Sequence, residues 1–144
     1  MKKNNSLECI ILIDDDKITN YINKKIIKKA NIDTHIMISS NSEDALLYLK
    51  KLSLEQATNN ENKIEPRPSI IFLDINMPKM NGWDFIAEYK KLPDSTKNNI
   101  QITMLTTSVN PDDEKKASTL PEINYFLKKP LTKEKLLDTI NRFY

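Results

Sequence analysis

The sequence is poor in three residue types that often carry chemistry or shape the backbone, because its 144 residues include one cysteine, one histidine and one glycine. The single cysteine, Cys9, excludes an internal disulfide and fits a reducing compartment. Positive and negative charges nearly cancel to a net charge of +2, so charge alone does not indicate nucleic-acid binding. No long apolar stretch follows the amino-terminal lysines, which predicts neither a signal peptide nor a membrane span. We therefore expect a cytoplasmic protein with no membrane or direct nucleic-acid partner.

The sequence does contain a regular alternation of two patterns. Five short apolar runs predict buried strands at residues 9–13, 34–39, 69–74, 101–106 and 124–129. Stretches with helical periodicity follow them, at residues 17–30, 42–52, 83–92, 110–120 and 131–143. Right-handed crossovers between successive strands then predict an α/β fold, a doubly wound, flavodoxin-like sheet of five parallel strands with helices on both faces.

Local signals mark where several helices begin and which face they bury. Residues suited to N-caps precede or open four of the predicted helices, namely Asp16, Asn41 or Ser42, Asn110 and Thr132. Within the first helix, Ile18, Ile22 and Ile26 recur at four-residue spacing, which predicts that they form one apolar stripe facing the core. Gly82 follows an asparagine, which predicts a turn with a positive φ.

The chain is predicted to form one domain. Its length suits a single core and is short for two, and it contains no internal repeat, coiled-coil heptads or interdomain linker. Residues 57–68 are polar, lack periodicity and include two prolines, so we expect a surface loop there. The last predicted helix ends at residue 143, so we expect residues 1–144 to contain no output domain.

Polar residues with complementary chemistry lie at the carboxyl ends of four predicted strands or directly after them. They are Asp14, Asp15 and Asp16 after the first strand, Asp74 at the end of the third, Thr106 of the fourth and Lys129 of the fifth. Ligands of such sheets bind at the carboxyl ends of the strands. Adjacent carboxylates repel by roughly 4 kcal/mol for unit charges about 4 Å apart at an effective dielectric of about 20, so the aspartates require a cation, a raised pKa or a helix N-terminus. Carboxylates beside a hydroxyl and a lysine suit Mg²⁺ and a phosphoryl group.

These residues lie in motifs that resemble the receiver domain of bacterial two-component response regulators, of the stand-alone, single-domain type. "LIDDD" is similar to the family's acidic pair and "IIFLDINMPKMNGWDFI" to its phosphoacceptor strand and loop. "MLTTS" matches its hydroxyl position, and "YFLKKPL" matches the Lys-Pro that closes the site. The four motifs occur in the family's order at matching spacing, nearly from end to end. The resemblance implies a signalling protein rather than an enzyme.

The resemblance assigns a role to each matching acidic residue. Asp74 is expected to be the phosphoacceptor, which becomes 4-aspartylphosphate. Asp14 and Asp15 are expected to hold Mg²⁺, with Asp15 the more direct ligand. Asp74 and the backbone carbonyl of Asn76 would complete the protein's share of the metal coordination.

The remaining matching residues are expected to act on the phosphoryl group and on the switch. Lys129 would pair with Asp74 or its phosphate, and the family's pattern implies a cis peptide bond between Lys129 and Pro130. Thr106 would bind a phosphoryl oxygen, and Phe126 would turn into the space that the hydroxyl leaves. This switch would change a docking surface on the helix at 110–120, the strand at 124–129 and the helix at 131–143.

The same resemblance implies partners. The phosphodonor would be a sensor histidine kinase or a histidine phosphotransfer protein, and the output would be docking to a downstream protein that the sequence does not identify. Many receivers also dimerise through this docking surface, so the same surface is a candidate interface for a homodimer.

Two other interpretations compete. Asp14-x-Asp16 resembles the nucleophile motif of haloacid-dehalogenase-type phosphatases, in which Asp14 would carry the phosphoryl group; Ile18 stands where that motif has threonine or valine. The second alternative is a pseudo-receiver that binds partners without being phosphorylated. Such proteins typically lack one of the acidic pair, the acceptor or the lysine, all of which are present here.

Overall fold

The computed structural model describes residues 7–58 and 66–144 of the chain. Strands and helices alternate along it in the order β1 (Cys9–Ile13), α1 (Lys17–Lys29), β2 (His35–Ser39), α2 (Ser42–Thr58), β3 (Ile70–Leu73), α3 (Gly82–Tyr89), α4 (Asp94–Lys97), β4 (Gln101–Thr106), α5 (Pro111–Ser118), β5 (Ile123–Lys128) and α6 (Lys133–Phe143). The predicted helices at 110–120 and 131–143 are thus α5 and α6. Asp16, Asn110 and Thr132 cap α1, α5 and α6 as predicted.

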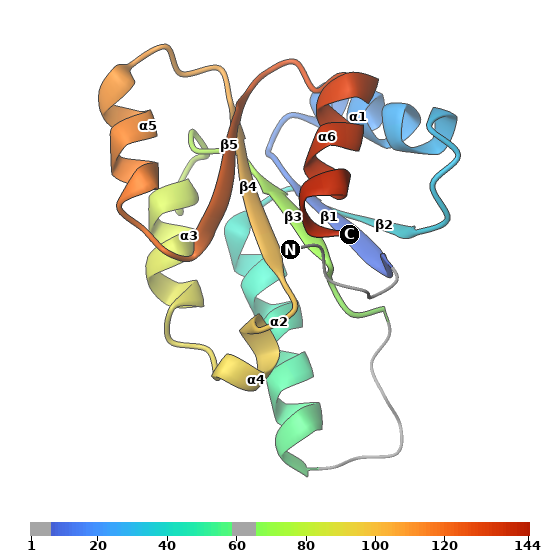
Figure 1. The fold of residues 1–144 in the computed structure, drawn as a ribbon. Helices are drawn as coiled ribbons and strands as arrows, with labels where there is room; N and C mark the ends of the chain where they lie inside the picture. Colours follow the sequence, from blue (N-terminus) through green and yellow to red (C-terminus); the bar gives the residue numbers. More distant parts are fainter. Residues whose placement is uncertain (1–6, 59–65) are drawn as a thin grey trace.

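The strands form one five-stranded sheet in the order β2-β1-β3-β4-β5 (Figure 1). All four neighbouring pairs are parallel. This is the predicted flavodoxin-like α/β topology. Because β1 and β3 are neighbours and β4 lies beyond β3, the ends of these three strands meet at the centre of one sheet edge.

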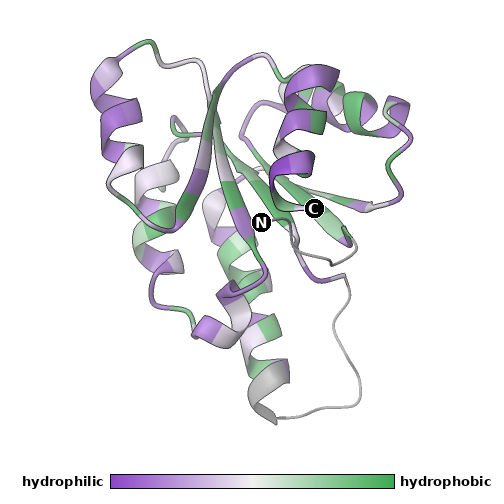
Figure 2. Cartoon of the chain, viewed as in Figure 1, coloured by the Kyte–Doolittle hydropathy of each residue, from purple (hydrophilic) through white to green (hydrophobic). Residues whose placement is uncertain are grey.

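Helices cover both faces of the sheet, and each face has its own apolar core (Figure 2). Strand side chains alternate between the faces, so Ile11 of β1 belongs to one cluster and Leu12 to the other. The first cluster packs against α2, α3 and α5, for example through Phe85 of α3. The second packs against α1 and α6, through Ile27 and Leu136. The three central strands are buried throughout, whereas β2 and β5 are partly exposed because they are edges.

Two sequence predictions about local structure were wrong in part, and one short helix was missed. The buried side chains of α1 are Asn20, Asn23 and Ile27, while Ile18 and Ile22 are 71% and 49% exposed. Of the predicted stripe, only Ile26 packs against the second core cluster, where it is partly buried. Helix α2 runs to residue 58, so the predicted loop at 57–68 starts two residues too early; residues 59–65 of it lie outside the described part of the chain. The short α4 was not predicted, because one turn is too brief to show a periodic pattern.

Gly82 was expected to adopt a positive φ, and this was wrong as well, because it is the first residue of α3 and no glycine has a positive φ. A glycine is needed there for space. A Cβ atom would lie 2.7 Å from the Asp74 carbonyl oxygen and 2.9 Å from the Cα of Ile75. The Gly82 N–H also donates to the Ile75 carbonyl at 2.8 Å. The start of α3 is therefore pressed against the backbone that follows β3.

The Gly82→Ala variant should lower the free energy of unfolding by about 1–3 kcal/mol, because the added methyl group must displace backbone. Urea denaturation would measure the change. The direction of the change distinguishes steric crowding from helix propensity. At an ordinary helical position, replacing glycine by alanine stabilises the protein by roughly 0.5–1 kcal/mol. Ala87→Gly, at an exposed position of the same helix, is the matched control and measures that propensity term. A stabilised Gly82→Ala protein would show that the close approach does not exist.

Candidate functional site

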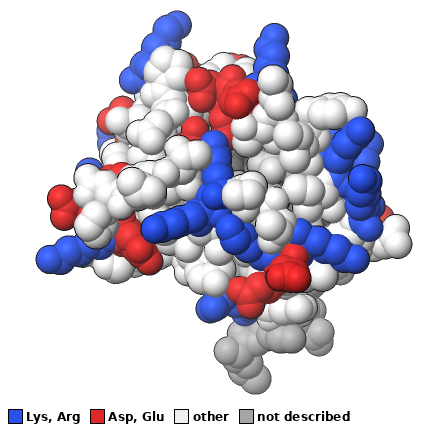
Figure 3. Space-filling view, turned by 90° about the horizontal axis from the view of Figure 1, so that it is seen from above, with Lys and Arg blue, Asp and Glu red and all other residues white. Residues whose placement is uncertain are grey.

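The carboxyl ends of the strands bring polar side chains to one edge of the sheet. Asp74 follows β3, and its backbone N–H donates to the Ile13 carbonyl at 3.0 Å, which places it beside the end of β1. Lys129 follows β5, and its backbone N–H donates to the Thr106 carbonyl at 2.8 Å. Figure 3 looks at the molecule from above the view of Figure 1 and shows acidic side chains grouped next to basic ones.

Three carboxylates form a compact cluster at this edge. One oxygen each from Asp14, Asp15 and Asp74 lies within 4.8 Å of the other two. Asp14 and Asp74 are only 5% and 6% exposed, whereas Asp15 is exposed to solvent. Oxygen donors at this spacing, partly open to water, fit a hard divalent cation such as Mg²⁺, which retains several water ligands. The cluster is therefore able to bind a metal ion.

Lys129 is the cation that faces this cluster. Its Nζ lies 2.6 Å from Asp14 Oδ2 and 3.6 Å from Asp74 Oδ1. Burial alone would lower the pKa of Lys129, but the hydrogen bond to Asp14 and the charge of Asp74 raise it on balance. The peptide bond between Lys129 and Pro130 is cis, as the resemblance to the receiver family implied. The lysine is thus held charged between the two buried carboxylates.

Four hydrogen bonds fix the position of Asp14. Its backbone N–H donates to the Ser39 carbonyl at 3.1 Å, and its backbone carbonyl accepts from Asn20 Nδ2 at 2.8 Å. Its Oδ1 accepts from the Asp16 N–H at 2.9 Å, while its Oδ2 accepts from Lys129. Neither carboxylate oxygen of Asp14 is without a hydrogen bond.

Asp16 serves α1 rather than the acidic cluster. Its side chain accepts hydrogen bonds from the Ile18 N–H at 3.0 Å and from the Thr19 hydroxyl at 2.8 Å. These bonds lower the pKa of Asp16. Its charge is therefore satisfied at the helix N-terminus, as expected for a capping carboxylate.

Asp74 is the carboxylate whose charge is least well satisfied. Burial and then the negative charge of Asp14 raise the pKa of Asp74 to about 6, although Lys129 and the Asn76 N–H act in the opposite direction. A cation in the cluster would relieve this repulsion. The Asn76 carbonyl as a further metal ligand stays a prediction.

Thr106 connects the site to α5 through contacts that the sequence did not single out. Its Oγ1 accepts from the Ser108 N–H at 3.1 Å. The Ser108 hydroxyl in turn donates to the carboxylate of Asp113, in the first turn of α5. A serine two residues after the strand and an acid in the next helix's first turn were visible in the sequence, but their pairing depends on how the loop folds. Phe126 of β5 is half-buried and packs against the first core cluster.

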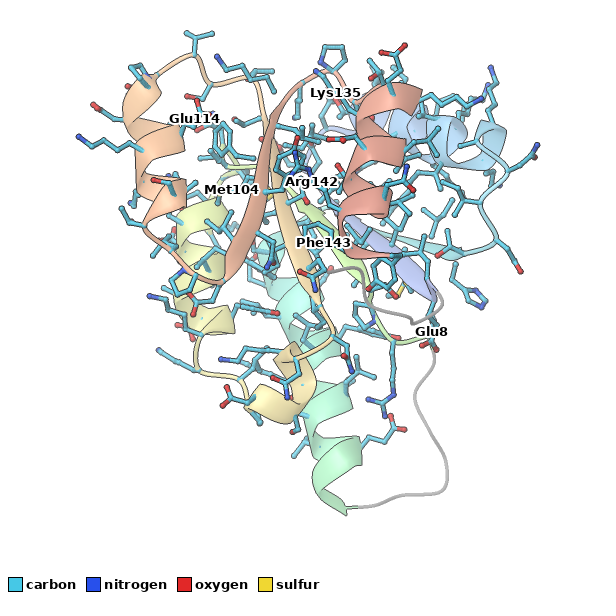
Figure 4. The ribbon with its side chains drawn as sticks, viewed as in Figure 1. Glu8, Met104, Glu114, Lys135, Arg142 and Phe143 are labelled. Atoms are coloured by element: carbon cyan, nitrogen blue, oxygen red, sulfur yellow. The ribbon has the colours of Figure 1, made fainter. Side chains whose placement is uncertain are left out.

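The surface beyond Thr106 is formed by α5, β5 and α6. The Lys116 ammonium of α5 lies 4.5 Å from the centre of the Trp83 ring, which joins α5 to α3. Helix α6 is joined to β5 by Arg142, whose guanidinium lies 4.0 Å from the centre of the Tyr125 ring, and by Lys135, whose Nζ donates to the Lys128 carbonyl at 2.7 Å. Lys135 and Arg142 are labelled on α6 in Figure 4.

Comparison with known proteins gives one consistent family. Residues 10–141 match the response regulator receiver domain. The chain is 32% identical over 111 residues to the response regulator Rcp1 of Synechocystis. The aligned region covers 77% of this chain and 69% of Rcp1. No helix among residues 7–58 and 66–144 combines the length and apolar character needed to cross a membrane.

Solved structures agree with this match. A two-component response regulator from Cytophaga hutchinsonii is 32% identical, with a TM-score of 0.79 and coverage of 96% of this chain and 97% of that one. The Mn²⁺-bound form of Rcp1 is 30% identical, with a TM-score of 0.67 and coverage of 93% and 89%. The fold, the acidic cluster and the family match together show that the chain belongs to the response regulator receiver domains of two-component systems, a family of signalling proteins that partner with histidine kinases.

Proposed function

We propose that this protein is a phosphoacceptor response regulator in which Asp74 takes a phosphoryl group in an Mg²⁺-dependent reaction. The donor is a histidine kinase or a histidine phosphotransfer protein, and a cytoplasmic location belongs to the same proposal. The observation that carries the proposal is the position of Asp74. It lies in an oxygen cluster with Asp14 and Asp15 and 3.6 Å from the Lys129 ammonium.

The residues divide the chemistry between them. An Asp74 carboxylate oxygen attacks the phosphorus atom of the phosphohistidine, an O–P bond forms, and the P–N bond breaks with its electron pair retained by the imidazole nitrogen. Lys129 offers a positive charge to the phosphoryl oxygens, and Thr106 a hydroxyl donor. When bound, Mg²⁺ supplies further positive charge that neutralises the phosphoryl oxygens and aligns them.

The hydrogen bonds of Asp14 favour this assignment over the phosphatase alternative. Both carboxylate oxygens of Asp14 accept a hydrogen bond, one from the Asp16 N–H and one from Lys129, which lowers their nucleophilicity while leaving lone pairs for a metal ion. The presence of the acidic pair, the acceptor and the lysine in one cluster supports a phosphorylated receiver over a pseudo-receiver.

The contacts of Thr106 support a route for the signal. If its hydroxyl turns to a phosphoryl oxygen, the Ser108 N–H loses its acceptor and the start of α5 loses one anchor. A phosphoryl group adds roughly 1.5 to 2 negative charges, and it acts at a distance only through an element with two arrangements. We propose that this element is Thr106 with Phe126, and that α5, β5 and α6 form the docking surface for a downstream protein. Phe126 has no hydroxyl to bury, so its inward rotamer costs no hydrogen bond.

The acceptor assignment predicts that wild-type protein is labelled by a small phosphodonor such as acetyl phosphate in the presence of Mg²⁺, and that Asp74→Asn is not. Mass spectrometry of the labelled protein would locate the modified residue. Asp16→Asn is the control, because Asp16 is an exposed carboxylate close to the site that only caps α1. Undiminished labelling of Asp74→Asn, with the group on Asp14, would favour the phosphatase alternative instead.

The proposed switch predicts that Thr106→Ala still allows phosphorylation of Asp74 but abolishes the structural response of α5, β5 and α6. Labelling of Asp74 should stay largely intact, because Mg²⁺ and Lys129 are unchanged, while backbone NMR shifts at residues 111–140 should no longer respond to a phosphoryl mimic such as beryllofluoride. Thr107→Ala removes an exposed hydroxyl one residue away and serves as the control. A wild-type response in Thr106→Ala would show that Thr106 is not the relay.

The raised pKa of Asp74 predicts how stability depends on pH in the metal-free protein. The folded pKa of about 6 lies above the ordinary value of 3.8, so folding disfavours the charged form, and the contribution of Asp74 to stability decreases as the pH rises between these values. Asp74→Asn lacks this charge. It should be more stable than wild type by about 1–3 kcal/mol above pH 6, and the difference should disappear below pH 4.

Urea denaturation in the presence of a chelator, repeated across this pH range, would test this prediction. Asp16→Asn should give no stabilisation, because folding lowers the pKa of Asp16 rather than raising it. An Asp74→Asn protein no more stable than wild type at pH 7.5 would contradict the electrostatic account.

A further inference from the structure

Asn20 is a buried polar residue that the proposed chemistry does not use. It lies on the face of α1 that packs on the sheet and is 3% exposed. Its Nδ2 donates to the Asp14 backbone carbonyl at 2.8 Å. Among the described residues, none donates a hydrogen bond to its Oδ1, which is buried.

The orientation of this amide follows from its surroundings. With the amide flipped, Oδ1 would face the carbonyl oxygen of Asp14, and two acceptors would meet without a proton between them. The observed orientation therefore leaves Oδ1 directed away from Asp14. Asn20 also lines a cavity of about 10 Å³ together with Asn23, Asp14 and Asp74, which is close to the smallest volume that holds one water molecule.

Stability alone gives a weak reason for an asparagine at this position. The bond to the Asp14 carbonyl is favourable, but taking the amide out of bulk water costs free energy of similar size and opposite sign. Leu12, Phe72 and Leu105 line the same cavity, so an apolar side chain would find apolar neighbours there. What the amide provides, and an apolar side chain would not, is the hydrogen bond to the Asp14 backbone.

We propose that Asn20 is a positioning residue for the metal site, which fixes the backbone of Asp14 from inside the protein. The other three bonds to Asp14 come from Ser39 of β2, from Asp16 and from Lys129. Of the four, only the bond from Asn20 ties the end of β1 to a buried side chain on the first turn of α1. Because Asp15 follows Asp14 directly, the same bond limits the movement of both acidic residues.

This inference rests on the proposed Mg²⁺ site, so that site is tested first. Mg²⁺ alone is titrated calorimetrically into metal-free wild type and into Asp15→Ala. Binding by the wild type and its loss in Asp15→Ala would establish the site. No binding by the wild type, or unchanged binding by Asp15→Ala, would overturn the site itself, and the inference about Asn20 with it.

With the site established, Asn20→Leu tests the positioning role. Leucine is similar in size to asparagine and cannot donate to Asp14. Residues that orient metal ligands typically change metal affinity by about 10–100-fold, so the Mg²⁺ dissociation constant should rise by about tenfold or more. The urea midpoint should stay within about 0.5 M of wild type, since the lost hydrogen bond and the removed cost of burying an amide offset each other. Should Asn20→Leu not fold, Asn20→Ala provides the same titration.

Asn23→Leu is the matched control. Asn23 lies on the same helix, is 5% exposed and lines the same cavity, but it is not among the residues that form the four hydrogen bonds to Asp14. Its dissociation constant for Mg²⁺ should stay within about twofold of wild type. Wild-type affinity in Asn20→Leu would overturn the inference. An equal loss in Asn23→Leu would also overturn it, because the effect would then come from the packing of the cavity.

Discussion

The repulsion between Asp14 and Asp74 is the constraint on which the rest of the site depends. Both carboxylates are almost fully buried at the ends of neighbouring strands, where water cannot screen them well. Lys129 reaches them from β5 and offsets part of the repulsion, but burial and then the charge of Asp14 still raise the pKa of Asp74 to about 6. The site therefore carries an excess of negative charge, which a divalent cation would neutralise.

The neighbouring structure keeps this unfavourable arrangement from relaxing. Asp14 is bonded through its backbone to Ser39 and Asn20, and the Asp74 N–H is part of the pairing between β1 and β3. Gly82 presses α3 against the backbone just after β3. Two apolar cores, one on each face, hold these elements in place. The backbones that carry the two carboxylates can therefore separate only if the sheet or α3 moves.

The sequence predicted the fold and the residues at the sheet edge well, because both depend on patterns that are local. Runs of isoleucine mark the central strands, and a parallel sheet brings the residues after them to one edge. Contacts set by tertiary packing were not predictable in the same way. The stripe of Ile18 and Ile22 satisfies the helical period, yet α1 turns Asn20 and Asn23 to the sheet. Periodicity alone could not show that the buried face was the one with asparagines.

Gly82 illustrates the same limit. A glycine after an asparagine usually indicates a positive φ, whereas here the residue is needed because backbone lies where a Cβ would be. The positive φ in this loop belongs to Lys79 instead. The link from Thr106 through Ser108 to Asp113 also depends on a loop shape that no periodic pattern encodes.

The contact between Trp83 and Lys116 has a spectroscopic consequence. Trp83 is the only tryptophan in the chain, and it lies on the helix that follows the Asp74 loop, with an ammonium group from α5 above its ring. A nearby positive charge alters the emission of an indole, so a displacement of α5 relative to α3 would change the intrinsic fluorescence. The unlabelled protein thus contains its own optical reporter at the junction between these two helices.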